Sequence, residues 1–134
     1  METRKSIVWQ LFESVWNNNE IATLQSLIDE SYVRHDPAYP TVPRGLDGFV
    51  TFHAQHVATF AEGHYTVEQM IAAGEIVITR WSFRAVHTGF FASFPPSGKQ
   101  IITSGITVSR IVNDRITEEW LQWDAWGLVR QITS

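Results

Sequence analysis

A single carboxylate stands among large aromatic residues near the end of the chain. In "EEWLQWDAWGLVRQI", residues 118–132, Asp124 has tryptophans at positions 120, 123 and 126. An apolar environment disfavours the charged form of a carboxyl group, which lets such a group act as an acid or a base near neutral pH. Asp124 is therefore a candidate proton-transfer group. The same position also suits an N-cap for a helix over "AWGLVRQI", or a surface acid paired with a base.

Alternation along strands sorts the residues that could surround Asp124. The period-two pattern predicts two strands within residues 65–89 and one each over 101–112 and 115–126. One face of each of the last three strands is expected to line a common cavity. The residues predicted to share it are Trp81, Phe83, His87, Arg110, Trp120, Gln122 and Asp124. Leu121 and Trp123 alternate with these residues, so they are expected to face away from the cavity.

Asp124, His87 and Arg110 are expected to meet in that cavity. Arg110 would hold a substrate oxyanion or keep a neighbouring carboxylate ionised, and His87 or His35 would relay a second proton. Each also has a plainer interpretation. His87 could satisfy the backbone of the loop that follows it, Arg110 could form a surface ion pair, and His35 could open a turn in "HDP".

Two other polar motifs do not predict a cofactor. "HAQH" places His53 and His56 three residues apart on a helix, but no acidic residue stands at ligand spacing, so we expect no metal site. "PPSGK" contains Gly-Lys without the spacing of a phosphate-binding loop. We therefore predict chemistry without a metal or an organic cofactor.

The elements that position these residues divide the chain into two parts. Apolar residues at helical spacing predict three helices before Gly63, around residues 7–16, 21–28 and 46–60. The segment "YVRHDPAYPTVPRG" between the second and third helices reads as an ordered loop. About four antiparallel strands follow, with turns near Ala73-Gly74 and at Asn113-Asp114. The expected fold is α+β, with the helices packed on one face of the sheet.

Composition narrows the class of protein. The chain has 134 residues, 13% aromatic residues and a formal charge of −4. This length predicts a single domain over 1–134, and the negative charge argues against a nucleic-acid partner. Long apolar runs, a signal peptide and cysteines are all missing, so we expect a cytoplasmic protein that does not act at a membrane.

Six segments in order resemble the SnoaL-like polyketide cyclases of the nuclear-transport-factor-two-like superfamily. They are "YVRHDP", "RGLDGFVTF", "GEIVITRWSFRAVHTGFF", "PPSGKQI", "GITVSRIVNDRITEEW" and "WDAWGLVRQI". The resemblance covers nearly the whole chain. It implies a cone made of a curved antiparallel sheet around three N-terminal helices, with an internal pocket, and a cofactor-free aldol ring closure that uses an Asp on the last strand. Asp124 matches that Asp, and His35, His87 and Arg110 match positions that commonly face the pocket in relatives.

The chain also departs from the pattern of these relatives. Glu119 stands where they usually have a His, and we expect it to face away from the pocket. Ala85-Val86 replaces the usual Gly-Thr before His87, which puts the pocket shape and hence the substrate in doubt.

Three functions follow as hypotheses. The first is a cofactor-free enzyme that closes a ring in, or isomerises, a hydrophobic carbonyl-bearing small molecule. Its apolar body would be bound by Trp81, Phe83, Phe91 and Trp120, with Gln122 beside them. The second is a non-catalytic module that carries an apolar ligand in the same pocket. The third is a dimerisation domain, in which the convex sheet face with Leu121 and Trp123 forms the interface; we expect a homodimer or higher homo-oligomer through that face for an enzyme as well.

Overall fold

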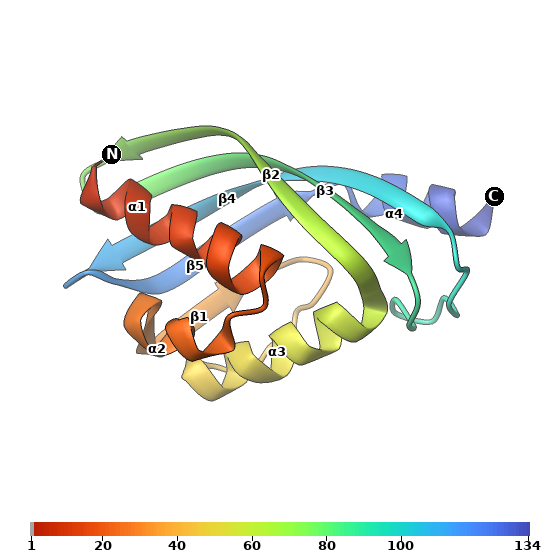
Figure 1. Ribbon diagram of the computed structural model, residues 1–134, viewed down its shortest axis with the longest axis horizontal. Coiled ribbons are helices and arrows are strands. Elements are labelled where there is room, and N and C mark those ends of the chain that lie inside the picture. Colours follow the sequence, from red (N-terminus) through yellow and green to blue (C-terminus); the bar gives the residue numbers. More distant parts are fainter. Residues whose placement is uncertain (1) are drawn as a thin grey trace.

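A curved five-stranded sheet forms the frame of the molecule, seen in the computed structural model, which describes residues 2–134 (Figure 1). The strands are β1 (Ile28–His35), β2 (Phe60–Ala73), β3 (Ile76–His87), β4 (Gln100–Val112) and β5 (Arg115–Trp123). Their order in the sheet is β1-β5-β4-β3-β2. All neighbours are antiparallel except β1, which pairs parallel with β5. The α+β class predicted from the sequence is confirmed.

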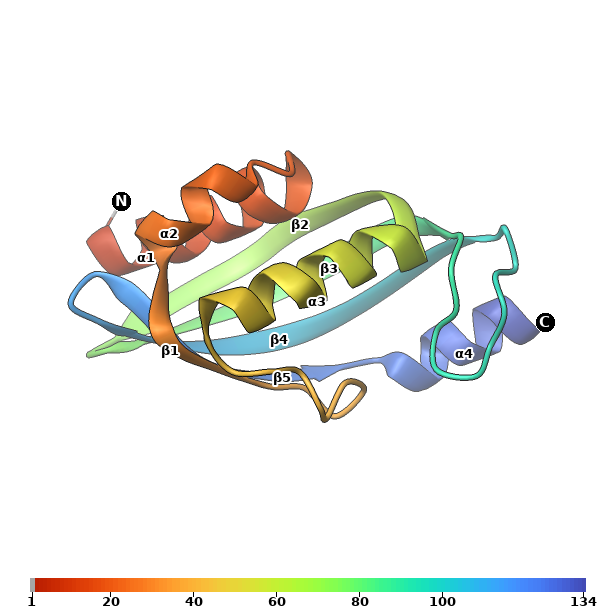
Figure 2. The ribbon, with the colours of Figure 1, turned by 90° about the horizontal axis from the view of Figure 1, so that it is seen from below.

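The helices before β2 all pack on one face of this sheet (Figure 2). They are α1 (Thr3–Gln10), which continues as a π-helix (Leu11–Asn17), then a 3₁₀ turn (Ile21–Thr23) with α2 (Leu24–Leu27), and α3 (Gly45–Thr59). These correspond to the three predicted helices. α4 (Ala125–Thr133) follows β5 and lies at the end of the sheet beside the loop 88–99 (Figure 1).

Two tight turns set the registers of the long strands. Gly74, with φ +59°, lies in the turn between β2 and β3. Asn113 and Asp114, with φ of 51° and 59°, join β4 to β5 in the conformation that two-residue hairpins require. Both turns stand where the sequence predicts them.

The core lies between the helices and the concave face of the sheet. β3 shows the alternation most clearly, because Val77, Trp81, Phe83 and Ala85 are buried on one face. From the other side, Leu11, Val15 and Phe49 fill the space below the helices. The interior is therefore rich in aromatic and branched side chains, as the composition predicts.

The π-helical segment is tied to the outer strand β2. The side chain of Asn17 accepts a hydrogen bond from the backbone N–H of Tyr65 at 2.7 Å and donates one to its carbonyl oxygen at 2.9 Å. The helix is thus fastened to the edge of the sheet, and the backbone of Tyr65 is held at one position.

The first strand differs from the prediction. Residues 32–35 were expected in a loop, but they belong to β1, and the sheet has five strands where about four were predicted. The polar residues of "YVRHDP" hide this strand, because its inner side chains are held by hydrogen bonds and ion pairs. Among residues 2–134, the structure contains no helix long and apolar enough to cross a membrane.

Candidate active site

The residues predicted to line the pocket lie on two different faces of the sheet. Trp81 and Phe83 of β3 point into the interior as expected, and both line an interior cavity. Phe91, from the loop 88–99, is also buried; its ring packs edge-on against Trp123 with centroids 5.9 Å apart. Three predicted pocket residues therefore lie in or against the interior.

The predicted faces of β4 and β5 are reversed. Register pairs Gly105 with Trp123 and Thr107 with Leu121, and Gly105 pairs in turn with the inward-facing Trp81. Leu121 and Trp123 therefore line the cavity, contrary to the prediction. Trp120, Gln122 and Arg110 lie on the outer face, so the expectation that they share the cavity is wrong.

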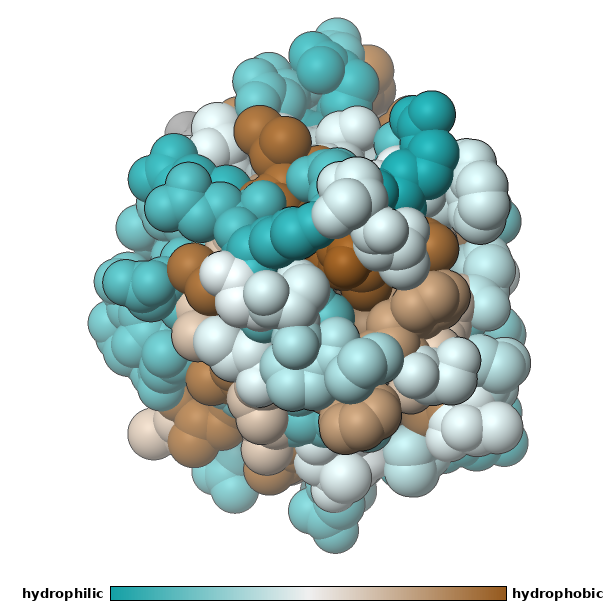
Figure 3. All heavy atoms as spheres, turned by 90° about the vertical axis from the view of Figure 1, so that its right-hand side faces the viewer, coloured by the Kyte–Doolittle hydropathy of each residue, from teal (hydrophilic) through white to brown (hydrophobic). Residues whose placement is uncertain are grey.

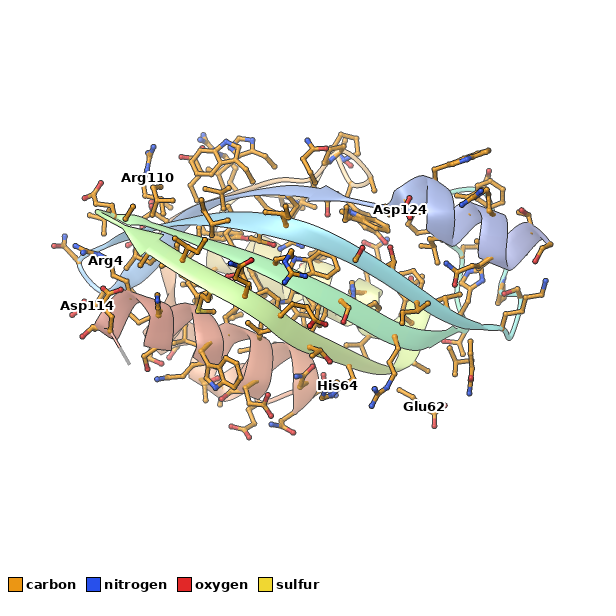
Figure 4. All side chains as sticks on the ribbon, turned by 90° about the horizontal axis from the view of Figure 1, so that it is seen from above. Arg4, Glu62, His64, Arg110, Asp114 and Asp124 are labelled. Carbon is orange, nitrogen blue, oxygen red and sulfur yellow. The ribbon has the colours of Figure 1, made fainter. Side chains whose placement is uncertain are left out.

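Asp124 lies outside the cavity at the start of α4 (Figure 4). Its side chain is exposed, and Oδ1 accepts a hydrogen bond from the backbone N–H of Gly127 at 2.8 Å. Arg110 lies far along the sheet from Asp124 (Figure 4). It pairs with Glu118 of β5, and Asp124 follows Glu118 by six residues, which corresponds to roughly 20 Å of extended strand. The expected meeting of Asp124, His87 and Arg110 is therefore wrong, and the helix N-cap alternative describes Asp124. Its catalytic role stays a prediction that this position does not favour.

His35 and Arg110 meet each other on the outer face. The His35 ring stacks on Trp120 with centroids 5.5 Å apart, and its Nε2 is 2.6 Å from a Glu118 oxygen. The Arg110 guanidinium lies 5.4 Å from the centre of the Trp120 ring and 3.4 Å from the other Glu118 oxygen. These residues form an exposed surface cluster, and His35 and Arg110 do not face the interior cavity.

His87 is fully buried but fastens a loop. Its Nδ1 accepts a hydrogen bond from the backbone N–H of Ser97 at 3.1 Å, so the neutral ring carries its proton on Nε2. Nε2 has no hydrogen-bond partner among residues 2–134. The plainer interpretation, in which His87 satisfies the backbone of the following loop, describes this contact.

The interior cavity is narrow and mostly aromatic. Its volume is about 30 Å³, enough for two or three water molecules at about 10–15 Å³ each. Aromatic rings from the sheet, α3 and the loop after β1 form most of its wall: Tyr39, Phe52, Phe60, Tyr65, Trp81, Phe83 and Trp123. α4 and the loop 88–99 lie at the end of the molecule shown in Figure 3, where apolar surface appears between polar side chains. A cavity of this size admits only a few atoms.

Arg34 brings a buried positive charge to the cavity wall. Its side chain is 6% exposed, and its guanidinium lies 4.5 Å from the centre of the Phe52 ring. Its Nη atoms lie 3.8 Å from an oxygen of Asp36 and 3.8 Å from an oxygen of Glu119. Nε is buried and has no hydrogen-bond partner among residues 2–134. Nη2, 3.8 Å from Asp36, also makes no hydrogen bond to these residues, so Arg34 has donor capacity left there for a bound molecule, whereas Nε is shielded from the cavity.

The two buried carboxylates are held differently. Both oxygens of Glu119 accept hydrogen bonds, one from Tyr32 at 2.8 Å and one from Ser109 at 2.6 Å. Asp36 is 5% exposed and uses one oxygen, Oδ1, to accept from Trp123 Nε1 and from the backbone N–H of Ala38, both at 3.0 Å. Its Oδ2 has only the long ion pair with Arg34. Asp36 thus keeps one oxygen that accepts no hydrogen bond, whereas each oxygen of Glu119 already accepts one.

Electrostatics keep Arg34 charged in this buried position. Burial by itself lowers the pKa of the Arg34 guanidinium, but Tyr32 and the two carboxylates raise it, and the net shift is upward. Burial also raises the pKa of Tyr32, and the charge of Glu119 adds to that shift. The site therefore has a fixed cation between two acids, and Tyr32 remains a hydrogen-bond donor.

A neutral histidine and a tyrosine complete the polar part of the wall. His56 of α3 and Tyr65 of β2 both line the cavity, and the Nε2 of His56 is 3.1 Å from the Tyr65 hydroxyl. His53, one turn earlier, hydrogen-bonds to the carbonyl oxygen of Val15 at 3.2 Å. No group of three His, Asp or Glu side chains within residues 2–134 is arranged to hold a metal ion.

The polar centre of the cavity was not predicted from the sequence. Tyr32, Arg34 and Asp36 alternate in "YVRHDP", which is the spacing of one strand face, but the segment was read as a loop. Glu119 was expected to face away from the pocket and is instead buried beside Arg34. The signal that could have found the site was this alternation, together with the inward face of Leu121 and Trp123.

Comparison with known proteins places the chain in a family. The model of the SnoaL-like polyketide cyclases matches residues 6–132. A candidate polyketide cyclase from Acidithiobacillus ferrooxidans superposes with a TM-score of 0.88 at 28% identity, over 98% of this chain and 95% of the other. IdmH, a candidate polyketide cyclase from Streptomyces antibioticus, gives 0.85 at 26% identity, over 99% and 100%.

A third comparison shows the fold alone. The structure of TsrD from Streptomyces laurentii superposes with a TM-score of 0.84 at 22% identity, over 95% of each chain. No curated protein sequence matches the chain. Because the family model spans nearly all of its length, the chain belongs to the SnoaL-like polyketide cyclase family.

Proposed function

We propose that this protein is a cofactor-free acid/base enzyme that acts on a small carbonyl-bearing molecule in its interior cavity. The reaction would begin with removal of a proton from the carbon next to the carbonyl and lead to ring closure or isomerisation. One observation carries the proposal: Asp36, with a free oxygen, and Arg34, with a free N–H, lie side by side on the wall of one buried cavity.

Asp36 is the proposed base. Its Oδ1 is fixed by two donors, so the carboxylate cannot turn, while Oδ2 is free to take a proton. Glu119 is less suited, because Tyr32 and Ser109 occupy both of its oxygens. Glu119 instead balances the charge of Arg34 and holds it in place.

Arg34 is the proposed donor to the developing oxyanion. Proton removal next to a carbonyl places negative charge on the carbonyl oxygen, and a fixed cation in a dry site stabilises that charge. The guanidinium is already oriented by the two carboxylates and by the face of Phe52, so it needs no rearrangement. The surrounding aromatic rings would bind the apolar part of the molecule.

Solvent-deuterium exchange tests this proposal with acetone, which is small enough for a narrow cavity. Proton NMR in D₂O follows the loss of its α-protons, with and without the protein. We expect the protein to accelerate exchange and Asp36→Asn to reduce the acceleration by about 100-fold or more, in line with general-base contributions. Asp124→Asn is the matched control and should retain activity. Undiminished exchange in Asp36→Asn, or its loss in Asp124→Asn alone, would overturn the assignment.

A non-catalytic carrier of an apolar ligand remains the second candidate. The aromatic wall favours it, because such a wall binds apolar molecules without chemistry. A carrier predicts a ligand retained through purification, visible by mass spectrometry of the denatured protein. It also predicts no exchange into any carbonyl compound. Exchange that depends on Asp36 would exclude it.

We further propose that the outer face of the sheet forms a homodimer interface. The residues that support this differ from those predicted from the sequence, since Leu121 and Trp123 face inward. The exposed outer face carries Ile78, Ile102 and Ile106, with Val108 and Trp120 half-buried beside them. Burying such apolar side chains favours association. Light scattering after size exclusion should give a dimer mass, and Ile106→Asp should shift it toward the monomer.

A further inference from the structure

The hydroxyl of Tyr65 is a polar group on the cavity wall that the proposed proton transfer does not use. Its ring is fixed on several sides, with centroids 4.3 Å from Phe83, 5.2 Å from Trp81 and 5.6 Å from Phe12. Asn17 holds its backbone through two hydrogen bonds. The position of the hydroxyl oxygen is therefore set by the fold.

His56 determines which way this hydroxyl points. Burial lowers the pKa of His56 to about 3, with smaller contributions from the charges of Arg34 and His53, so the ring is neutral. Burial raises the pKa of Tyr65, so the phenol keeps its proton. Among residues 2–134, the hydrogen-bond partner of the Tyr65 hydroxyl is the Nε2 of His56, 3.1 Å away. Because a phenol is a stronger hydrogen-bond donor than a neutral imidazole, and an imidazole nitrogen is a stronger acceptor than a phenol oxygen, we assign the shared proton to Tyr65, which donates to Nε2; His56 then carries its own proton on Nδ1.

This direction leaves the Tyr65 oxygen as an acceptor without a protein donor. A phenolic oxygen that donates its proton can still accept a hydrogen bond. The inference rests on the proposed function. The cavity would then offer a hydrogen-bond donor on Arg34, an acceptor on Asp36 and a second acceptor on Tyr65. The carbonyl oxygen would bind to the donor, which leaves the Tyr65 acceptor for a hydroxyl group of the same molecule.

We propose that Tyr65, positioned by His56, accepts a hydrogen bond from a hydroxyl group of the substrate, so that the cavity prefers short hydroxy ketones to simple ketones. The hydroxyl must lie close to the carbonyl, because the cavity admits only a few atoms. A site built to pair with a hydroxyl discriminates against the analogue that lacks it. The preference expected from one neutral hydrogen bond is about 3- to 10-fold in exchange rate at low probe concentration.

The experiment compares exchange of the α-protons of hydroxyacetone and acetone, each corrected for its uncatalysed rate in buffer. In the wild type the acceleration should be larger for hydroxyacetone. Tyr65→Phe keeps the ring and its packing, and it should lower the ratio of the hydroxyacetone rate to the acetone rate 3- to 10-fold. Equal changes for the two probes, or no change for either, would overturn the role of Tyr65.

Two variants of His56 test its positioning role. His56→Gln retains an acceptor oxygen and should preserve most of the preference for hydroxyacetone over acetone, whereas His56→Leu should abolish that preference. Nitrogen NMR shifts give an independent measure, because they distinguish a ring protonated on Nδ1 from one protonated on Nε2. A proton on Nε2 would reverse the hydrogen bond and overturn the inference.

The two failures can be told apart. If the proposed function fails, neither probe exchanges faster than in buffer, or exchange does not depend on Asp36. If only the role of Tyr65 fails, both probes exchange in an Asp36-dependent way and Tyr65→Phe changes the two exchange rates by the same factor.

Discussion

Replacing Arg34 with methionine tests whether the buried charge cluster is one coupled unit. The substitution keeps an unbranched side chain but leaves the carboxylates of Asp36 and Glu119 without their cation. Removing one partner of a buried ion pair costs about 3–5 kcal/mol. Both N···O distances are 3.8 Å and neither carboxylate receives a short bond from the guanidinium, so we expect the lower end of that range.

The expected loss converts to a clear change in melting temperature. Unfolding entropy is about 0.3 kcal/mol per kelvin for a chain of 134 residues. A loss of about 3 kcal/mol therefore lowers the melting temperature by about 10 °C. Urea unfolding followed by circular dichroism at neutral pH gives the free energy directly.

Two further variants make this measurement specific. Arg110→Met removes an arginine that also pairs with a glutamate and lies over a tryptophan, but its side chain is 44% exposed. It should cost less than about 1 kcal/mol, as surface pairs do. Combining Arg34→Met with Glu119→Gln removes one uncompensated charge and should be less destabilising than Arg34→Met alone. A double variant no more stable than Arg34→Met, or a loss in Arg34→Met no larger than in Arg110→Met, would show that these charges are not coupled.

Two other predictions concern acid stability and packing. Burial lowers the pKa of His56 to about 3 in the folded protein, from about 6.5 in the unfolded chain. Between these two pH values the unfolded chain therefore binds one more proton than the folded protein. The free energy of unfolding then falls as the pH drops through this window, by up to about 1.4 kcal/mol per pH unit. His56→Gln should flatten that slope in urea titrations at pH 5 and pH 7, and an unchanged slope would contradict the assignment. Gly105→Ala would place a methyl group 2.5 Å from Trp123 Cβ and 2.6 Å from Trp81 Cζ2, so we expect a loss of about 1–3 kcal/mol from overpacking. A melting temperature equal to that of the wild type would show that the cavity wall is softer than these distances imply.

The fold could be predicted from local patterns, but which face of β4 and of β5 lies toward the interior could not. Turn residues and helical periodicity located most elements, and β3 was oriented correctly because its inner face is the more apolar one. In β4 the rule fails. Its inner face carries Thr103, Thr107 and Ser109, while Ile102 and Ile106 face outward. Hydropathy therefore indicated the wrong face, so Asp124 rather than Asp36 was expected at the cavity.

The reversed faces have a common physical cause. Thr107 accepts a hydrogen bond from the Trp81 indole at 2.9 Å, and Ser109 donates to Glu119. Polar residues can face the interior of this sheet because they satisfy one another and the Arg34 cluster there. Such long-range pairing joins residues of β4 to β3 and β5 and leaves no periodic signal in either segment, so the inward position of Glu119 could not be predicted.

The link from Asn17 to Tyr65 also bears on how the molecule avoids aggregation. β2 is an outer strand, and unpaired backbone groups on an outer strand can recruit a strand from another molecule. The Asn17 side-chain amide offers the same donor and acceptor as a peptide group, and it occupies the N–H and carbonyl of Tyr65 from the solvent-facing edge. A foreign strand would have to displace it before extending the sheet there. The residue that steadies one wall of the cavity thereby protects the open edge of the sheet.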